Sequence, residues 1–127
     1  KLQEKYTANR SSWLLGIIWS VWHFPFMVYL FYPFGIPILI FSLIGFTMSI
    51  IANAILYTWI YNNTKSIFLC IILHAIFNLS AAYILALVSH PLTGTILAAL
   101  QWGIAIFLLK KYGPEDLIRK RVKKETA

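Results

Sequence analysis

The chain has 127 residues, of which 60% are hydrophobic and 12% are charged, and its formal net charge is +7. A soluble domain carries about a quarter charged residues, whereas here no charged residue occurs in the stretches 11–64 and 66–109. Each stretch is longer than the roughly 20 apolar residues that cross a bilayer. The composition therefore excludes an ordinary soluble globular domain and predicts an all-α, polytopic membrane protein.

The apolar stretches predict four transmembrane helices, followed by a basic tail. The predicted helices cover residues 12–32, 34–61, 67–88 and 95–109, and the tail covers 110–127. On the second helix, Ser42, Gly45, Ser49 and Ala52 recur at three- and four-residue spacing. Small side chains in such a row let another helix approach closely.

The tail begins with Pro114, Glu115 and Asp116, which suit the first turn of a helix. Apolar residues against a basic face then favour a short surface helix on anionic lipid. A solvated basic tail is the alternative interpretation.

The eleven basic residues lie in three places: before residue 11, at Lys65, and from Lys110 onward. Basic residues beside membrane spans mark the cytoplasmic side and attract anionic lipid, so this charge does not indicate a nucleic-acid partner. The turns near Gly35 and Pro91 have no basic residue. We therefore expect both chain ends on the cytoplasmic side of a cell membrane, which we expect to be a bacterial plasma membrane.

Three polar side chains lie inside the predicted spans at similar depth. His74 and Asn78 are four residues apart and so share a helix face. With a rise of about 1.5 Å per residue, His23 and Asn78 lie about 16 Å from the cytoplasmic helix ends, and His74 about 10 Å. A single histidine in a span is as often a packing group as a functional one, but three coinciding polar groups favour a shared site.

These groups have the chemistry for hydrolysis, except that a carboxylate to activate water is missing. A neutral histidine can accept a proton or orient a water, and an asparagine amide can donate to an oxyanion. The four acidic residues all lie in the polar end segments, at Glu4, Glu115, Asp116 and Glu125. No carboxylate within the predicted spans is thus available to activate water.

Two segments resemble motifs of the CPBP family of intramembrane proteases, which comprises CAAX proteases and bacteriocin-processing (Abi) proteins. Trp19-Ser20-Val21-Trp22-His23-Phe24-Pro25 is similar to the second motif, with Trp19 where phenylalanine is commoner. His74-Ala75-Ile76-Phe77-Asn78 resembles the third motif, His-x-x-x-Asn. The family's first motif, a Glu-Glu pair followed by an Arg, is absent, and Glu4 and Arg10 do not have its spacing. We expect the chain to be the carboxy-terminal portion of one protease domain.

The resemblance implies roles for the three polar residues. A missing Glu and His23 would activate water, while His74 and Asn78 would stabilise the oxyanion. The substrate would be a membrane-associated peptide, either prenylated or a bacteriocin precursor, and this portion alone would be inactive without the upstream Glu-bearing segment. A divalent metal has been invoked for the family, although the sequence does not require one.

Two other interpretations stay open. One is a bacteriocin-immunity or membrane binding protein on the same scaffold, without proteolysis. The other is a membrane haem protein with His23 and His74 as axial ligands, which leaves Asn78 unexplained.

Overall fold

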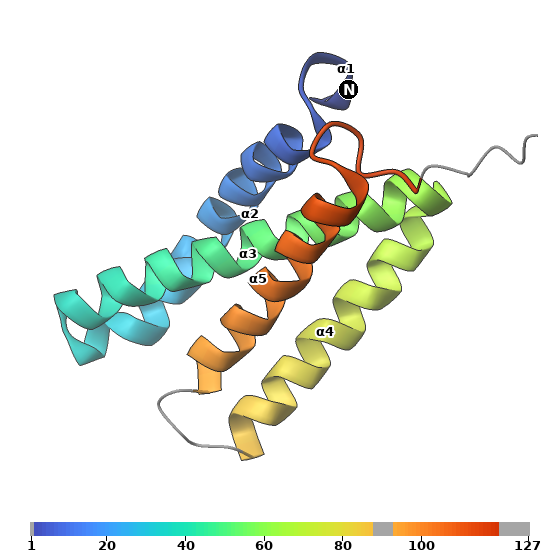
Figure 1. Cartoon of the computed structure of the whole chain (residues 1–127). Coiled ribbons are helices and arrows are strands. Elements are labelled where there is room, and N and C mark those ends of the chain that lie inside the picture. The colour runs from blue at the N-terminus through green and yellow to red at the C-terminus, as the bar shows by residue number, and fades with distance from the viewer. Residues whose placement is uncertain (1, 88–92, 120–127) are drawn as a thin grey trace, which may run out of the picture.

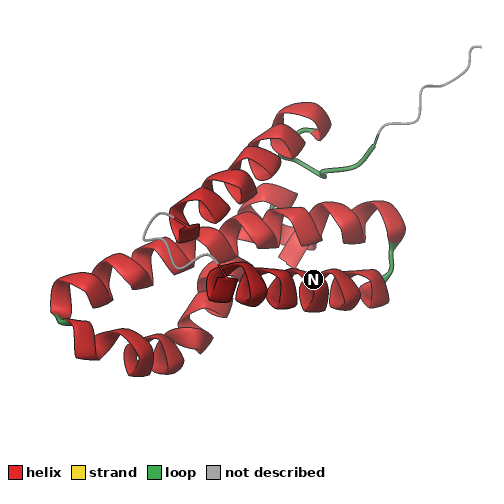
Figure 2. Cartoon of the chain, turned by 90° about the horizontal axis from the view of Figure 1, so that it is seen from below, coloured by secondary structure: helices red, strands yellow, loops and turns green. Residues whose placement is uncertain are grey.

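The computed structural model describes residues 2–87 and 93–119, in which helices are joined by short turns (Figure 1). The elements are α1 (Leu2–Lys5), α2 (Ala8–Phe31), the 3-10 helix η1 (Tyr32–Phe34), α3 (Ile36–Thr64), α4 (Ile67–Leu87) and α5 (Thr93–Tyr112). These residues contain no strand, as the second view also makes plain (Figure 2). Helices α2 to α5 are each long and apolar enough to cross a membrane. The predicted all-α polytopic fold with four spanning helices is confirmed.

Helix α2 begins at Ala8, before the predicted start at residue 12. The Thr7 hydroxyl accepts a hydrogen bond from the Arg10 backbone N–H at 3.2 Å and caps the helix. At the other end, Gly35 has φ +96°, a conformation that costs glycine little, and it joins η1 to α3. The polar amino-terminal segment therefore contributes the first turn of the first spanning helix.

Helix α3 is the centre of the bundle, because α2 and α5 both pack against it. The buried core cluster consists of Ala8, Ile51, Ala52, Ile55, Ala105, Leu108 and Leu117. Helix α4 lies at the edge of the bundle (Figure 1), and none of its described side chains is buried. The helix that bears His74 and Asn78 is consequently the least enclosed of the four spanning helices.

Only some of the small residues in the predicted row on α3 contact another helix. Ala52 is buried in the core, and the Ser49 hydroxyl donates a hydrogen bond to the Gln101 side chain on α5. A methyl group added to Gly45 would meet no atom within 4 Å. The closest approach lies elsewhere, where Gly16 of α2 meets Ile51 of α3.

The predicted surface helix after Pro114 is wrong over the described residues, since 114–119 form a turn and irregular chain. The backbone carbonyls of Pro114 and Glu115 accept hydrogen bonds from the N–H groups of Asn9 and Ala8, at 3.0 and 2.6 Å. These carbonyls satisfy the free N–H groups at the start of α2 instead of forming a helix of their own. Residues 120–127 of the basic tail lie outside the described residues, as do residues 88–92, which contain the predicted turn at Pro91.

Residues 114–119 also accept hydrogen bonds from the end of α3. The Asn62 side-chain amide donates to the Asp116 carbonyl at 2.6 Å, and that of Asn63 donates to the Leu117 carbonyl at 2.9 Å. The start of α2, the end of α3 and residues 113–119 therefore lie at one end of the bundle. This arrangement agrees with the predicted topology, and the cytoplasmic assignment of that end stays a prediction.

Candidate active site

Three helices bring aromatic and polar side chains together in one cluster. Trp19 and His23 come from α2, Tyr57 comes from α3, and His74 and Asn78 come from α4. The Trp19 ring centre lies 6.3 Å from that of His23, 5.2 Å from that of His74 and 6.1 Å from that of Tyr57. Trp19 thus contacts both histidines and joins the two halves of the predicted site.

His74 and Asn78 form a hydrogen-bonded pair along α4. The Asn78 side-chain nitrogen lies 3.1 Å from His74 Nε2. An amide NH₂ group only donates, so this contact assigns the lone pair of neutral His74 to Nε2 and its proton to Nδ1. The Asn78 amide therefore keeps its second N–H free, and the His74 ring holds that amide in place. Such a donor can stabilise an oxyanion.

His23 is held by its own helix. Its Nδ1 atom lies 2.8 Å from the backbone carbonyl oxygen of Trp19, one turn earlier. Because a carbonyl only accepts, Nδ1 of neutral His23 carries the proton and Nε2 keeps the lone pair. The ring also packs against Phe46 of α3, with ring centres 5.5 Å apart. His23 is thereby oriented as a proton acceptor through Nε2.

The two histidines are neighbours of one tryptophan but do not bond to each other. In residues 2–87 and 93–119, no hydrogen bond joins His23 to His74. His23 and His74 are each partly buried, whereas Asn78 is exposed on α4. The structure hence brings the three predicted residues to one region, as the depth estimate requires, with room for other groups beside Asn78.

Tyr57 is a member of the cluster that sequence reasoning missed. Its ring meets the His74 ring edge-on, with centres 6.0 Å apart and an angle of 84°. Its hydroxyl oxygen is buried without a hydrogen-bond partner among the described residues. The sequence contains one indication of this: Tyr57 lies four residues before Tyr61, deeper in the span than the interface where tyrosines usually lie.

The donors present do not by themselves make a metal centre. The described part of the chain contains no group of three His, Cys, Asp or Glu side chains close enough to hold a metal ion. Its aspartate and glutamate residues, Glu4, Glu115 and Asp116, all belong to the end segments. Two histidines and an asparagine offer too few strong ligands to hold a metal ion by themselves.

An apolar hollow of about 350 Å³ lies between α2 and α3. Its lining residues are Phe24, Ile40, Leu43, Ile44, Thr47 and Met48. Phe24 follows His23 in the chain, and Thr47 follows Phe46, whose ring contacts His23. The hollow therefore involves the same segments of α2 and α3 as His23 and Phe46, although neither of these two residues lines it.

Comparison with known proteins supports one family. The family described as "Type II CAAX prenyl endopeptidase Rce1-like" matches residues 1–80. A curated CAAX prenyl protease 2 from Methanococcus maripaludis is 37% identical over 83 residues, which cover 62% of this chain and 30% of that relative. The chain thus spans less than a third of the relative's length. No match to a solved structure was found. With more than half of its residues matched, the chain belongs to the Rce1-like family of type II CAAX prenyl endopeptidases.

Proposed function

We propose that residues 1–127 carry the proton-accepting histidine and the oxyanion-binding pair of an intramembrane endopeptidase. The observation that carries this proposal is the His74–Asn78 hydrogen bond of 3.1 Å, on a helix whose His74 ring shares the neighbour Trp19 with the His23 ring. A hydrolytic site needs a base for the water and donors for the oxyanion. His23 Nε2 supplies the first, and the His74–Asn78 pair supplies the second.

The proposed reaction begins with attack of a water oxygen on the carbonyl carbon of the scissile peptide. His23 Nε2 takes a proton from that water, and the carbonyl oxygen becomes an oxyanion. The second Asn78 N–H donates a hydrogen bond to this oxygen, while His74 Nε2 accepts the first Asn78 N–H and so orients the amide. Collapse of the intermediate breaks the C–N bond, and the proton passes to the leaving amine. Each of these steps uses an atom that the hydrogen bonds of His23 and His74 leave free.

We further propose that a carboxylate from outside residues 1–127 shares the water with His23. A lone histidine is a weaker activator of water than a histidine paired with a carboxylate. The acidic residues of the described chain lie at the end of the bundle near the chain termini, away from the spanning helices that carry His23 and His74. The chain by itself is then inactive, and a Glu-bearing segment restores cleavage.

The proposed substrate is a prenylated or otherwise membrane-associated peptide. The hollow between α2 and α3 is lined almost wholly by apolar side chains, so it suits an isoprenoid or acyl chain better than a polar group. The name of the curated relative also refers to a prenyl protease. Location in a bacterial plasma membrane stays a prediction.

The test compares the chain alone with the chain joined to an upstream segment that supplies a glutamate pair. We expect cleavage of a prenylated model peptide only from the joined protein, and its loss in a His23→Ala variant. Ser80→Ala, an exposed position on the same helix as Asn78, is the control and should keep full activity. Cleavage by residues 1–127 alone would contradict the need for an outside carboxylate. Failure of the joined protein to cleave would favour a binding or immunity role for this scaffold.

A further inference from the structure

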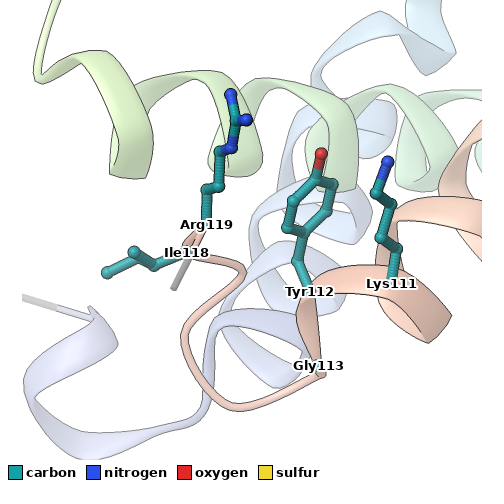
Figure 3. Close-up of a pocket in the computed structure, with 5 residues that line it drawn as sticks. All are labelled: Lys111, Tyr112, Gly113, Ile118 and Arg119. Carbon is teal, nitrogen blue, oxygen red and sulfur yellow. The ribbon is translucent and has the colours of Figure 1, made fainter. Parts of the chain in front are cut away.

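A pocket of about 510 Å³ lies at the end of α5, distant in sequence from the candidate active site. Its lining residues are Lys111, Tyr112, Gly113, Ile118 and Arg119 (Figure 3). We propose that this pocket binds the phosphate group of an anionic phospholipid. Arginine forms paired hydrogen bonds with phosphate oxygens and lysine adds a point charge, and basic pockets beside membrane helices bind such head groups.

The fold brings the two cations together although they lie eight positions apart. Helix α5 ends at Tyr112, and Gly113, with φ +81°, reverses the chain. Leu117 is fully buried and fixes the returning segment in the core, with φ +52°. The Arg119 backbone N–H then donates to the Asn63 side-chain oxygen at 2.8 Å. The backbone of the pocket is consequently fixed at both of its ends.

The polar tips of the pocket residues point to the same side. Figure 3 shows the Lys111 ammonium, the Tyr112 hydroxyl and the Arg119 guanidinium all directed away from the loop toward one face. The Lys111 Nζ atom lies 5.1 Å from the Phe107 ring centre and 5.6 Å from that of Tyr112. These cation–π contacts hold the ammonium at the pocket while leaving its N–H groups available.

The cations are not neutralised within the described chain. Neither Lys111 nor Arg119 forms a salt bridge with any residue that the structure describes. Of the two nearby acids, Asp116 accepts a hydrogen bond from the Ile118 N–H at 3.2 Å. Glu115 lies beside Gly113, with its Oε2 atom 3.4 Å from where a Gly113 Cβ would be. Two cations with free donors thus face a pocket that an anion would complete.

The position of the pocket identifies the source of the phosphate as a lipid. Lys111 closes a helix that is apolar over its spanning length, so the pocket lies where the hydrocarbon region meets the head groups. Phe107, one turn earlier on α5, is 55% exposed and faces the level of the acyl chains. A phospholipid could therefore place its phosphate on Lys111 and Arg119 and its chains along α5. A free phosphate ion would offer only the first of these contacts.

The test measures binding of dioctanoyl phosphatidylglycerol to the intact chain purified in detergent. We expect Lys111→Gln and Arg119→Gln each to weaken this binding at least about tenfold, because each removes a charge-assisted hydrogen bond to the phosphate. Lys110→Gln is the matched control, because it removes the same charge from the neighbouring position, which does not line the pocket. Arg119→Lys keeps the charge without the paired hydrogen bonds and should give an intermediate loss.

The remaining arms distinguish the sources of phosphate. Inorganic phosphate at the same concentration should compete weakly, and a competitor as strong as the lipid would identify a free phosphate site instead. Dioctanoyl phosphatidylcholine, whose head group has no net charge, should bind less well than phosphatidylglycerol. An equal loss in the Lys110, Lys111 and Arg119 variants would overturn the proposal, because binding would then reflect overall charge. Absence of binding to the unmodified chain would overturn it as well.

Discussion

Gly16 of α2 meets Ile51 of α3 so closely that a Cβ added to Gly16 would lie 2.8 Å from the Ile51 Cα atom. The obstacle is backbone rather than the end of a flexible side chain, so the two helices must separate to admit a methyl group. Gly16→Ala should destabilise the protein by about 1–3 kcal/mol. Thermal unfolding in detergent checks this value.

Gly103→Ala is the matched control for this close approach. Gly103 is also inside a spanning helix, but a Cβ there would meet no atom within 4 Å. Alanine favours a helix over glycine by up to about 1 kcal/mol, so this variant should be at least as stable as the unmodified protein. Equal stability of the two variants would show that α2 and α3 do not pack as tightly as the structure has them.

The sequence predicts the helices well because their signals are local. Long stretches without charge locate α2 to α5, and the spacing of His74 and Asn78 places them on one face of α4. The close approach of Gly16 is not predictable from spacing, because it depends on which face of α2 meets α3. The small residue Gly45 has the expected spacing, yet no neighbour reaches it.

The conformation of the tail after Pro114 and the place of Tyr57 in the cluster could not be predicted from the sequence either. Both depend on contacts between segments that are far apart in the chain. Pro114 and Glu115 have the composition of a helix start, but their carbonyls bond to the start of α2, over a hundred residues away in sequence. Tyr57 becomes notable only when its ring is seen against His74. In both cases tertiary contacts decide the outcome, and local propensity does not contain them.

The fixed tail gives a stability prediction at Leu117. Its side chain is fully buried against the core, so Leu117→Ala should cost about 2–5 kcal/mol or release the segment from the bundle. Trypsin should then cleave at Arg119 faster than in the unmodified protein. Ile118→Ala, a neighbouring position that is 36% exposed, is the control and should change the cleavage rate little. Equal rates for both variants would mean that Leu117 does not fix the tail.

The unpartnered hydroxyl of Tyr57 gives a prediction for both stability and activity. Tyr57→Phe keeps the ring contact with His74 and removes a buried oxygen without a partner, so the protein should be as stable or slightly more stable. Because this hydroxyl is buried, it reaches neither substrate nor water, and the joined protein with its glutamate pair should keep its kcat/KM. A loss of about tenfold would show instead that the site opens and that a substrate or water atom bonds to Tyr57.

Filling the apolar hollow between α2 and α3 should weaken substrate binding. Leu43→Trp would fill part of its volume of about 350 Å³ and should raise KM for a prenylated peptide while changing kcat less. Ile38→Trp places the same side chain on α3 outside the hollow, at a residue that is 49% exposed, and should leave KM unchanged. Equal effects of the two variants would exclude the hollow as the site of the apolar group.

The hydrogen bond from Asn78 to His74 yields the sharpest kinetic prediction. Asn78→Ala removes one oxyanion donor and also the group that fixes the proton of His74 on Nδ1. Removal of a single oxyanion-hole donor lowers kcat by about 10²–10³, and we expect a loss of that size in the joined protein, with KM little changed. Because Asn78 is exposed at the edge of the bundle, the variant should keep its thermal stability. A loss confined to KM would instead place Asn78 in substrate binding and not in the oxyanion site.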